Sequence, residues 1–139
     1  MRAIFDINVV LDVLLQREPH HFTSSKVLTL ADRNEISGHF CAASVDNTLY
    51  VLERELEKSV ARRAIHTLLD ILRICPVNET TIRSALNLQW PDMEDAILYE
   101  SARAAGLDTV ITRDAKDFMR GKLRVLTPTE VIIQQKNRF

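Results

Sequence analysis

The sequence predicts a three-layer α/β/α protein, in which helices cover both faces of a central, mostly parallel sheet of short strands. Short apolar segments alternate with longer segments whose apolar residues recur at helical spacing, which is the pattern of βαβ units. The short segments are apolar throughout, as strands buried on both faces are. With 139 residues, 46% of them hydrophobic, the chain is long enough for one such domain over residues 1–139 and too short for two.

The first half of the chain is expected to form a strand at 2–5, a helix that Pro19 ends, a helix at 22–32, a strand at 36–41, and helices at 44–56 and 60–72. The first strand is too short and too apolar to be exposed. In the helix after it, Val9, Val13 and Leu14 share one face, and Asp12 is expected to point away from that face. Gly38 is expected to interrupt the second strand.

The second half is expected to form a strand at 72–75, helices at 78–86 and 91–106, strands at 109–112 and 123–126, and a helix from 127. Asn78 can cap the first of these helices, and Gly106 suits the position after the end of the second. The last helix opens on Thr127, Pro128 and Glu130, which form a capping-box pattern with proline at the first helical position.

Composition and charge exclude several classes of protein. No apolar run approaches the ~18–20 residues of a membrane span, and the chain reaches Asp6 too early for a signal peptide. Two cysteines, Cys41 and Cys75, lack CxxC spacing, which excludes a disulfide framework and a cysteine zinc site and predicts a cytoplasmic protein. Because the net charge is −1, any contact with nucleic acid depends on local basic patches.

Acidic residues gather where the predicted strands end. Asp6 and Asp114 follow strands, whereas Asp46, Asp92 and Asp95 are expected in the first turns of helices. In a parallel α/β fold these positions share one edge of the sheet, where such folds bind their ligands. Several carboxylates in one pocket need a counter-charge, and oxygen ligands favour Mg²⁺ or Mn²⁺ over Zn²⁺. An acidic pocket that holds these ions is typical of phosphoryl chemistry.

Helix capping is the simpler interpretation of each acid taken alone, since Asp is among the best N-cap residues. Two pairs have the spacing of an N-cap and its N3 residue: Asp92 with Asp95, and Asp114 with Asp117. Capping does not explain why Asp6 ends a buried strand and is followed by Asn8.

Four segments, in order, resemble motifs of the PIN-domain ribonucleases. They are 6–12 (D-x-N-x-x-x-D), 90–96 (D-x-x-D-A), 110–118 (T-R-D-x-x-D-F) and 125–130 (V-x-T-P-x-E). The resemblance implies a PIN fold and an endoribonuclease that depends on Mg²⁺ or Mn²⁺ and hydrolyses RNA phosphodiester bonds to a 5′-phosphate and a 3′-hydroxyl. It also suggests kinship with the VapC-type toxins of bacterial toxin–antitoxin pairs, and with it an antitoxin partner and a homodimer.

Carried over residue by residue, the resemblance makes Asp6, Asp95 and Asp114 the catalytic acids that hold the metal. Asn8 would orient Asp6. The other supporting residues would be Asp92, Thr112 and Asp117.

One position departs from the family's pattern, which has an acid, usually Glu, early in the third helix. Asn47 takes that place, with Asp46 beside it. Neighbouring helix positions point about 100° apart, so only one of the two can face Asp6 and Asp95. We expect Asp46 to complete the site, because a fourth carboxylate better balances two divalent ions. The alternative, a site with three acids and an amide, would weaken metal binding. It would fit a catalytically impaired PIN-fold protein that binds RNA or protein as a regulator.

Basic residues flank Asp114 and offer contacts to the RNA backbone. Arg113, Lys116 and Arg120 are expected to hold phosphates beside the metal site. An ordinary solvated face is the alternative, because helices and turns often carry such charges.

Overall fold

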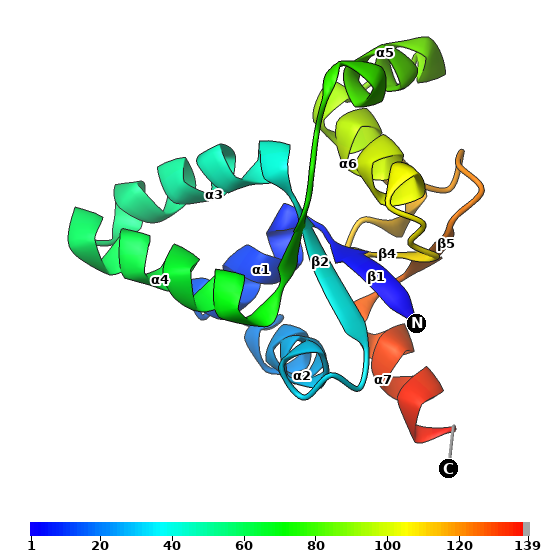
Figure 1. Cartoon of the computed structure of the whole chain (residues 1–139). Helices are drawn as coiled ribbons and strands as arrows, with labels where there is room; N and C mark the ends of the chain where they lie inside the picture. The colour runs from blue at the N-terminus through cyan, green and yellow to red at the C-terminus, as the bar shows by residue number, and fades with distance from the viewer. Residues whose placement is uncertain (138–139) are drawn as a thin grey trace.

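The computed structural model describes residues 1–137, and its strands and helices alternate as the sequence predicts (Figure 1). The elements are, in chain order, β1 (Arg2–Phe5), α1 (Ile7–Leu14), α2 (His21–Asp32), β2 (Ser37–Cys41), α3 (Ala42–Glu55), α4 (Lys58–Ile71), β3 (Arg73–Cys75), α5 (Glu79–Leu88), α6 (Met93–Ala104), β4 (Thr109–Ile111), the 3-10 helix η1 (Ala115–Asp117), β5 (Arg124–Leu126) and α7 (Pro128–Lys136). No helix in this part of the chain is long and apolar enough to cross a membrane.

The five strands form one sheet in the order β3-β2-β1-β4-β5, and every neighbouring pair is parallel. Phe5, the last residue of the central strand β1, lies opposite Phe40 of β2 and Ile111 of β4. The carboxyl ends of these three strands therefore meet at one edge of the sheet, and the residue after β1 lies at the middle of that edge. The predicted three-layer architecture is confirmed.

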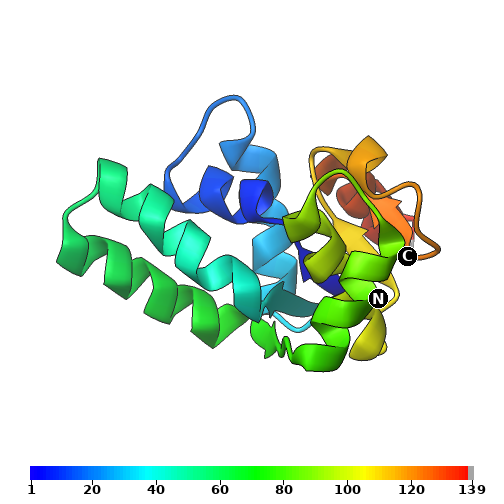
Figure 2. The ribbon, with the colours of Figure 1, turned by 90° about the horizontal axis from the view of Figure 1, so that it is seen from above.

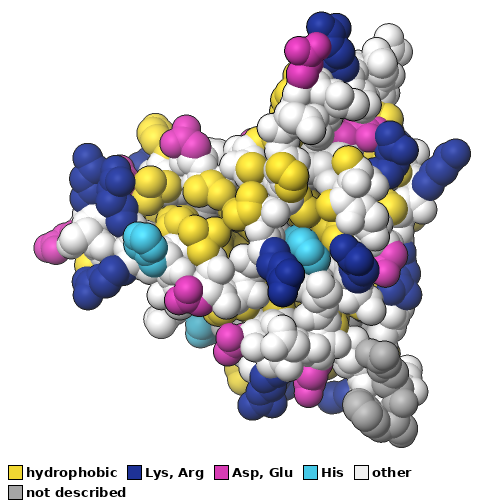
Figure 3. Space-filling view, in the orientation of Figure 1, with side chains coloured by type: hydrophobic (Ala, Val, Ile, Leu, Met, Phe, Trp, Pro, Cys, Tyr) yellow, Lys and Arg dark blue, Asp and Glu magenta, His cyan; other side chains and the backbone are white. Residues whose placement is uncertain are grey.

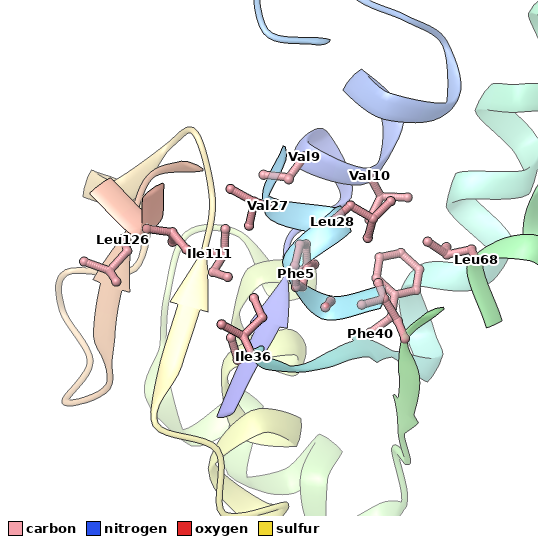
Figure 4. Close-up of a cluster of buried hydrophobic side chains, with 14 residues drawn as sticks. Phe5, Val9, Val10, Val27, Leu28, Ile36, Phe40, Leu68, Ile111 and Leu126 are labelled. Carbon is pink, nitrogen blue, oxygen red and sulfur yellow. The ribbon is translucent and has the colours of Figure 1, made fainter. Parts of the chain in front are cut away.

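Successive residues of β1 enter different hydrophobic cores, because side chains alternate across a strand. Phe5 packs with residues of α1, α2, α4 and α7 on one face of the sheet, where Figure 4 shows it near Val10 and Leu28. Ile4 packs on the other face with residues of α6, including Leu98. Helices thus cover both faces, and α5 lies beside α6 (Figures 1 and 2).

The α3–α4 hairpin extends from the body of the protein, with its two helices side by side (Figures 1 and 2). A third cluster of buried residues, Leu11, Leu52 and Ala61, joins both helices to α1. Since α3 begins at the end of β2 and is fixed against α1, its first two turns are held near the edge where the strands end.

The predicted caps are present at three helices. Asn78 and Thr127 each form a capping box, with Thr81 and Glu130 respectively. Asp92 caps α6, as its side chain accepts a hydrogen bond from the backbone N–H of Asp95 at 3.0 Å. These local signals set the helix starts because they satisfy backbone N–H groups that have no partner within the helix.

The expectation for Gly38 was wrong. Gly38 does not interrupt β2; it pairs in register with Ala3. A side chain at this position would place its Cβ 2.6 Å from Leu72 Cδ2, so the glycine serves the close packing of the sheet against its helices. Asp12, which was expected to point away from the apolar face of α1, is fully buried, for a reason given with the site below.

Candidate active site

Two acids and a threonine are linked where β1 and β4 end. The backbone N–H of Asp6 donates to the carbonyl oxygen of Ile111 at 2.9 Å, which fixes the start of α1 against the end of β4. The hydroxyl of the buried Thr112 donates to Asp6 Oδ2 at 2.7 Å and accepts from the backbone N–H of Asp114 at 3.0 Å. Asp6 also caps α1 through a 2.8 Å hydrogen bond from the N–H of Ile7.

Asn8 ties the same two segments together from the first turn of α1. Its Nδ2 donates to Asp114 Oδ2 at 3.0 Å, and its Oδ1 accepts from the backbone N–H of Arg113 at 3.4 Å. The amide of Asn8 therefore binds Asp114, whereas the resemblance implied that it orients Asp6. Asp114 itself forms no capping hydrogen bond at η1, so the capping interpretation does not account for this acid.

The acids from α6 and from the strand ends act on one another electrostatically. Burial, followed in order by the negative charges of Asp92, Asp6, Asp117 and Glu94, raises the pKa of Asp95 to about 7. These acids therefore belong to one acidic cluster at the edge of the sheet.

Asp6 is more deeply buried than the other acids of the cluster. Burial raises the pKa of Asp6, whereas its hydrogen bonds from Thr112 and Ile7 lower it, and the charges of Asp114 and Glu94 raise it again. The net effect raises the pKa of Asp6, chiefly because burial removes water from the charged carboxylate.

A small cavity of about 170 Å³ lies beside Asp95. Its lining residues are Trp90, Pro91, Asp92, Asp95, Lys116, Asp117 and Arg120. Two of the three basic residues expected to contact RNA thus lie at the same cavity as three of the predicted acids, and both are exposed.

Arg113, the third basic residue, forms an ion pair inside the protein. Its Nε and Nη2 donate to the two carboxylate oxygens of Asp12 at 2.6 and 3.2 Å, and Ser24 Oγ donates to the same carboxylate at 3.3 Å. This pairing is the reason that Asp12 can be buried with its charge, since a buried charge needs a partner. It also fixes the loop that carries Asp114 to α1 and α2.

Asn47 and Asp46 lie in the second turn of α3, because the helix begins at Ala42, two residues earlier than expected. Asn47 Nδ2 donates to both carboxylate oxygens of Glu94, at 3.1 and 3.3 Å. Asp46 is exposed and has no hydrogen bond or ion pair within the part of the chain that the structure describes. Glu94 was not among the residues predicted for the site, although it lies between two candidate acids in the first turn of a helix.

The chemistry of the acidic cluster fits a hard divalent cation, because the metal-binding atoms of these side chains are all oxygens. A cation would also relieve the repulsion between their like charges. Among residues 1–137, no three His, Cys, Asp or Glu side chains are placed to hold an ion as they stand. Ion binding by these acids would therefore require a rearrangement of side chains.

Comparison with known proteins identifies relatives of the whole chain. A family model described as "PIN domain" matches residues 2–116. "Ribonuclease VapC1" of Aquifex aeolicus (strain VF5) is 24% identical over 134 residues, which cover 93% of this chain and 92% of that protein.

Solved structures with the same fold include a DNA-bound VapBC2 and a toxin–antitoxin complex. VapBC2 from Rickettsia felis, bound to a promoter DNA fragment, superposes with a TM-score of 0.71 at 14% identity and covers 91% of this chain and 98% of that one. A toxin–antitoxin complex from Klebsiella pneumoniae gives a TM-score of 0.71 at 20% identity, with 91% and 97% covered.

Proposed function

We propose a function on the premise that this chain belongs to the PIN domain family, which the family model matching residues 2–116 establishes. The protein is an endoribonuclease that depends on Mg²⁺ or Mn²⁺ and acts as the toxin of a toxin–antitoxin pair. The observation that carries the proposal is the linked set Asp6–Thr112–Asp114 at the strand ends, with Asp95 beside it at a pKa of about 7. The name of the Aquifex relative, a ribonuclease, supports the choice of RNA as the substrate.

Asp6, Asp95 and Asp114 would hold the cations. When bound, divalent cations supply the positive charge that stabilises the attacking and leaving oxygens of an in-line displacement at phosphorus. Thr112 and Asn8 keep Asp6 and Asp114 in fixed positions before substrate arrives, which lowers the cost of assembling the site.

In this proposal, Lys116 and Arg120 bind RNA phosphates beside the acids. Both are exposed and line the cavity next to Asp95. Arg113 was expected to share this role, but its guanidinium donates to Asp12, so the proposed contact with RNA rests on the other two. Lysine and arginine in this position can hold the backbone without selecting a base sequence.

A protein partner is supported by the solved complexes and by an apolar surface. The Klebsiella structure described above is named a toxin–antitoxin complex, and we propose an antitoxin partner for this chain on that basis. Hydrophobic side chains gather over α3 and α4 in Figure 3, and α4 exposes Val60 and Leu69. Apolar surface of this kind marks contact with other proteins. A homodimer is the second assembly that we propose, from the family resemblance.

The decisive experiment is cleavage of a panel of single-stranded and structured RNAs with Mg²⁺ or Mn²⁺ and with EDTA. We expect cleavage only with the metals and at least a ~100-fold loss in Asp95→Asn, which corresponds to about 2.7 kcal/mol of transition-state stabilisation. Glu79→Gln, which changes an exposed first-turn acid on α5, is the matched control and should retain full activity. Full cleavage in EDTA, or no cleavage under any condition, would refute the proposal.

A further inference from the structure

Glu94 occupies the place where the acidic cluster meets α3. It is the second residue of α6, directly before Asp95, and its exposed side chain reaches across to the second turn of α3. There Asn47 Nδ2 lies 3.1 and 3.3 Å from its two carboxylate oxygens. One amide nitrogen thus lies within hydrogen-bond distance of both oxygens, which ties the carboxylate of α6 to α3.

The negative charge of Glu94 affects acids from two parts of the acidic cluster, the strand ends and α6. It raises the pKa of Asp6, which follows β1, and the pKa of Asp95, its neighbour on α6. The carboxylate of Glu94, which comes from α6, therefore lies close enough to both predicted metal acids to act on them.

Helix capping does not explain the position of Glu94. The N-cap of α6 is Asp92, whose side chain already accepts the hydrogen bond from the N–H of Asp95. The hydrogen bonds that Glu94 accepts come from Asn47 on another helix. A residue that only favoured the helix terminus would need no partner on α3.

We propose that Glu94 is the fourth carboxylate of the metal site, supplied from α6 in place of the acid that related ribonucleases carry at the position of Asn47. Asn47 is then a positioning residue, whose amide orients Glu94. The inference rests on the proposed function, because it concerns the same metal site. With Glu94, the metal site has four acids despite the amide at position 47. A complete set of acids favours an active enzyme over the alternative of an impaired, purely regulatory protein.

Manganese titration by calorimetry tests the role of Glu94 without depending on cleavage. We expect Glu94→Gln to bind Mn²⁺ at least ~10-fold more weakly than the unaltered protein, with unchanged urea denaturation in EDTA. Asp46→Asn, which removes the same charge from the helix that carries Asn47, should bind Mn²⁺ normally. Glu79→Gln serves as the control for loss of an exposed first-turn glutamate.

A double variant tests the exchange of positions. Asn47→Glu combined with Glu94→Gln moves the carboxylate to α3, and we expect it to recover most of the lost Mn²⁺ affinity and RNA cleavage. Asn47→Ala, which removes only the orienting amide, should reduce Mn²⁺ affinity less than Glu94→Gln does.

The outcomes separate the two proposals. An unaltered protein that neither binds Mn²⁺ nor cleaves RNA would refute the proposed function itself. An unaltered protein that does both, with Glu94→Gln indistinguishable from it, would overturn only the role of Glu94. A loss of Mn²⁺ affinity in Asp46→Asn alone would assign the fourth carboxylate to Asp46 and would also overturn this inference. A double variant with no more Mn²⁺ affinity or RNA cleavage than Glu94→Gln would overturn it as well.

Discussion

Replacing Asp95 with asparagine should stabilise the metal-free protein near neutral pH. The substitution keeps the size of the side chain and removes a negative charge. That charge is repelled by the negative charges of Asp92, Asp6, Asp117 and Glu94. It breaks no side-chain hydrogen bond of Asp95 within residues 1–137. The same change should abolish most RNA cleavage, so stability and activity should move in opposite directions.

The pKa of Asp95 sets the size and the sign of this effect. The rise from 3.8 to about 7 corresponds to ~4 kcal/mol at about 1.36 kcal/mol per pKa unit, and solvent screening at this partly exposed site reduces it to about 1–2 kcal/mol. Because the folded state holds the proton more tightly, it carries more protons than the unfolded chain between pH ~4 and ~7. The free energy of unfolding therefore falls as pH rises through this window.

Urea denaturation in EDTA at pH 4, 6 and 8 measures the prediction. Asp95→Asn should match the unaltered protein at pH 4 and exceed its free energy of unfolding by about 1–2 kcal/mol at pH 8. Added Mn²⁺ should stabilise the unaltered protein more than the variant, since a ligand stabilises the state that binds it. A variant that is less stable at pH 8, with the pH dependence of stability unchanged, would show that Asp95 has a structural role instead.

Three further substitutions test contacts that only the fold creates. Arg113→Met leaves the fully buried Asp12 without its partner and should lower the free energy of unfolding by about 3–5 kcal/mol in urea. Gly38→Ala should cost about 1–3 kcal/mol in the same assay, because the new Cβ would lie 2.6 Å from Leu72 Cδ2. Thr112→Val removes the hydroxyl that joins the two strand-end acids and should lower kcat for RNA cleavage more than it changes KM.

Each of these variants has a matched control. Arg83→Met breaks an exposed ion pair and should cost less than ~1 kcal/mol, so a loss equal to that of Arg113→Met would contradict the argument from burial. Ser37→Ala, beside Gly38 in β2, should change stability by less than about 0.5 kcal/mol. Thr112→Ser keeps the hydroxyl and should restore kcat; if it does not, the hydrogen bonds of Thr112 are not what matters.

Much of the fold follows from local chemistry that the sequence displays. Asn78, Asp92 and Thr127 cap helices as predicted, because a capping side chain needs only backbone groups two or three residues away. The start of α3 was harder to place: Cys41 offers no side-chain cap there, and the helix begins two residues before the expected position. That shift moved Asp46 and Asn47 into the second turn.

The sequence by itself determined the order of strands and helices, the parallel sheet and the edge at which Asp6, Asp95 and Asp114 gather. Periodicity and capping are local, and parallel strands must end at the same edge. The tertiary structure decided which polar side chains pair: Thr112 with Asp6, Arg113 with Asp12, and Asn47 with Glu94. These partners lie 106, 101 and 47 residues apart, and their contact depends on how packing rotates each helix against the sheet, which no local pattern in the sequence specifies.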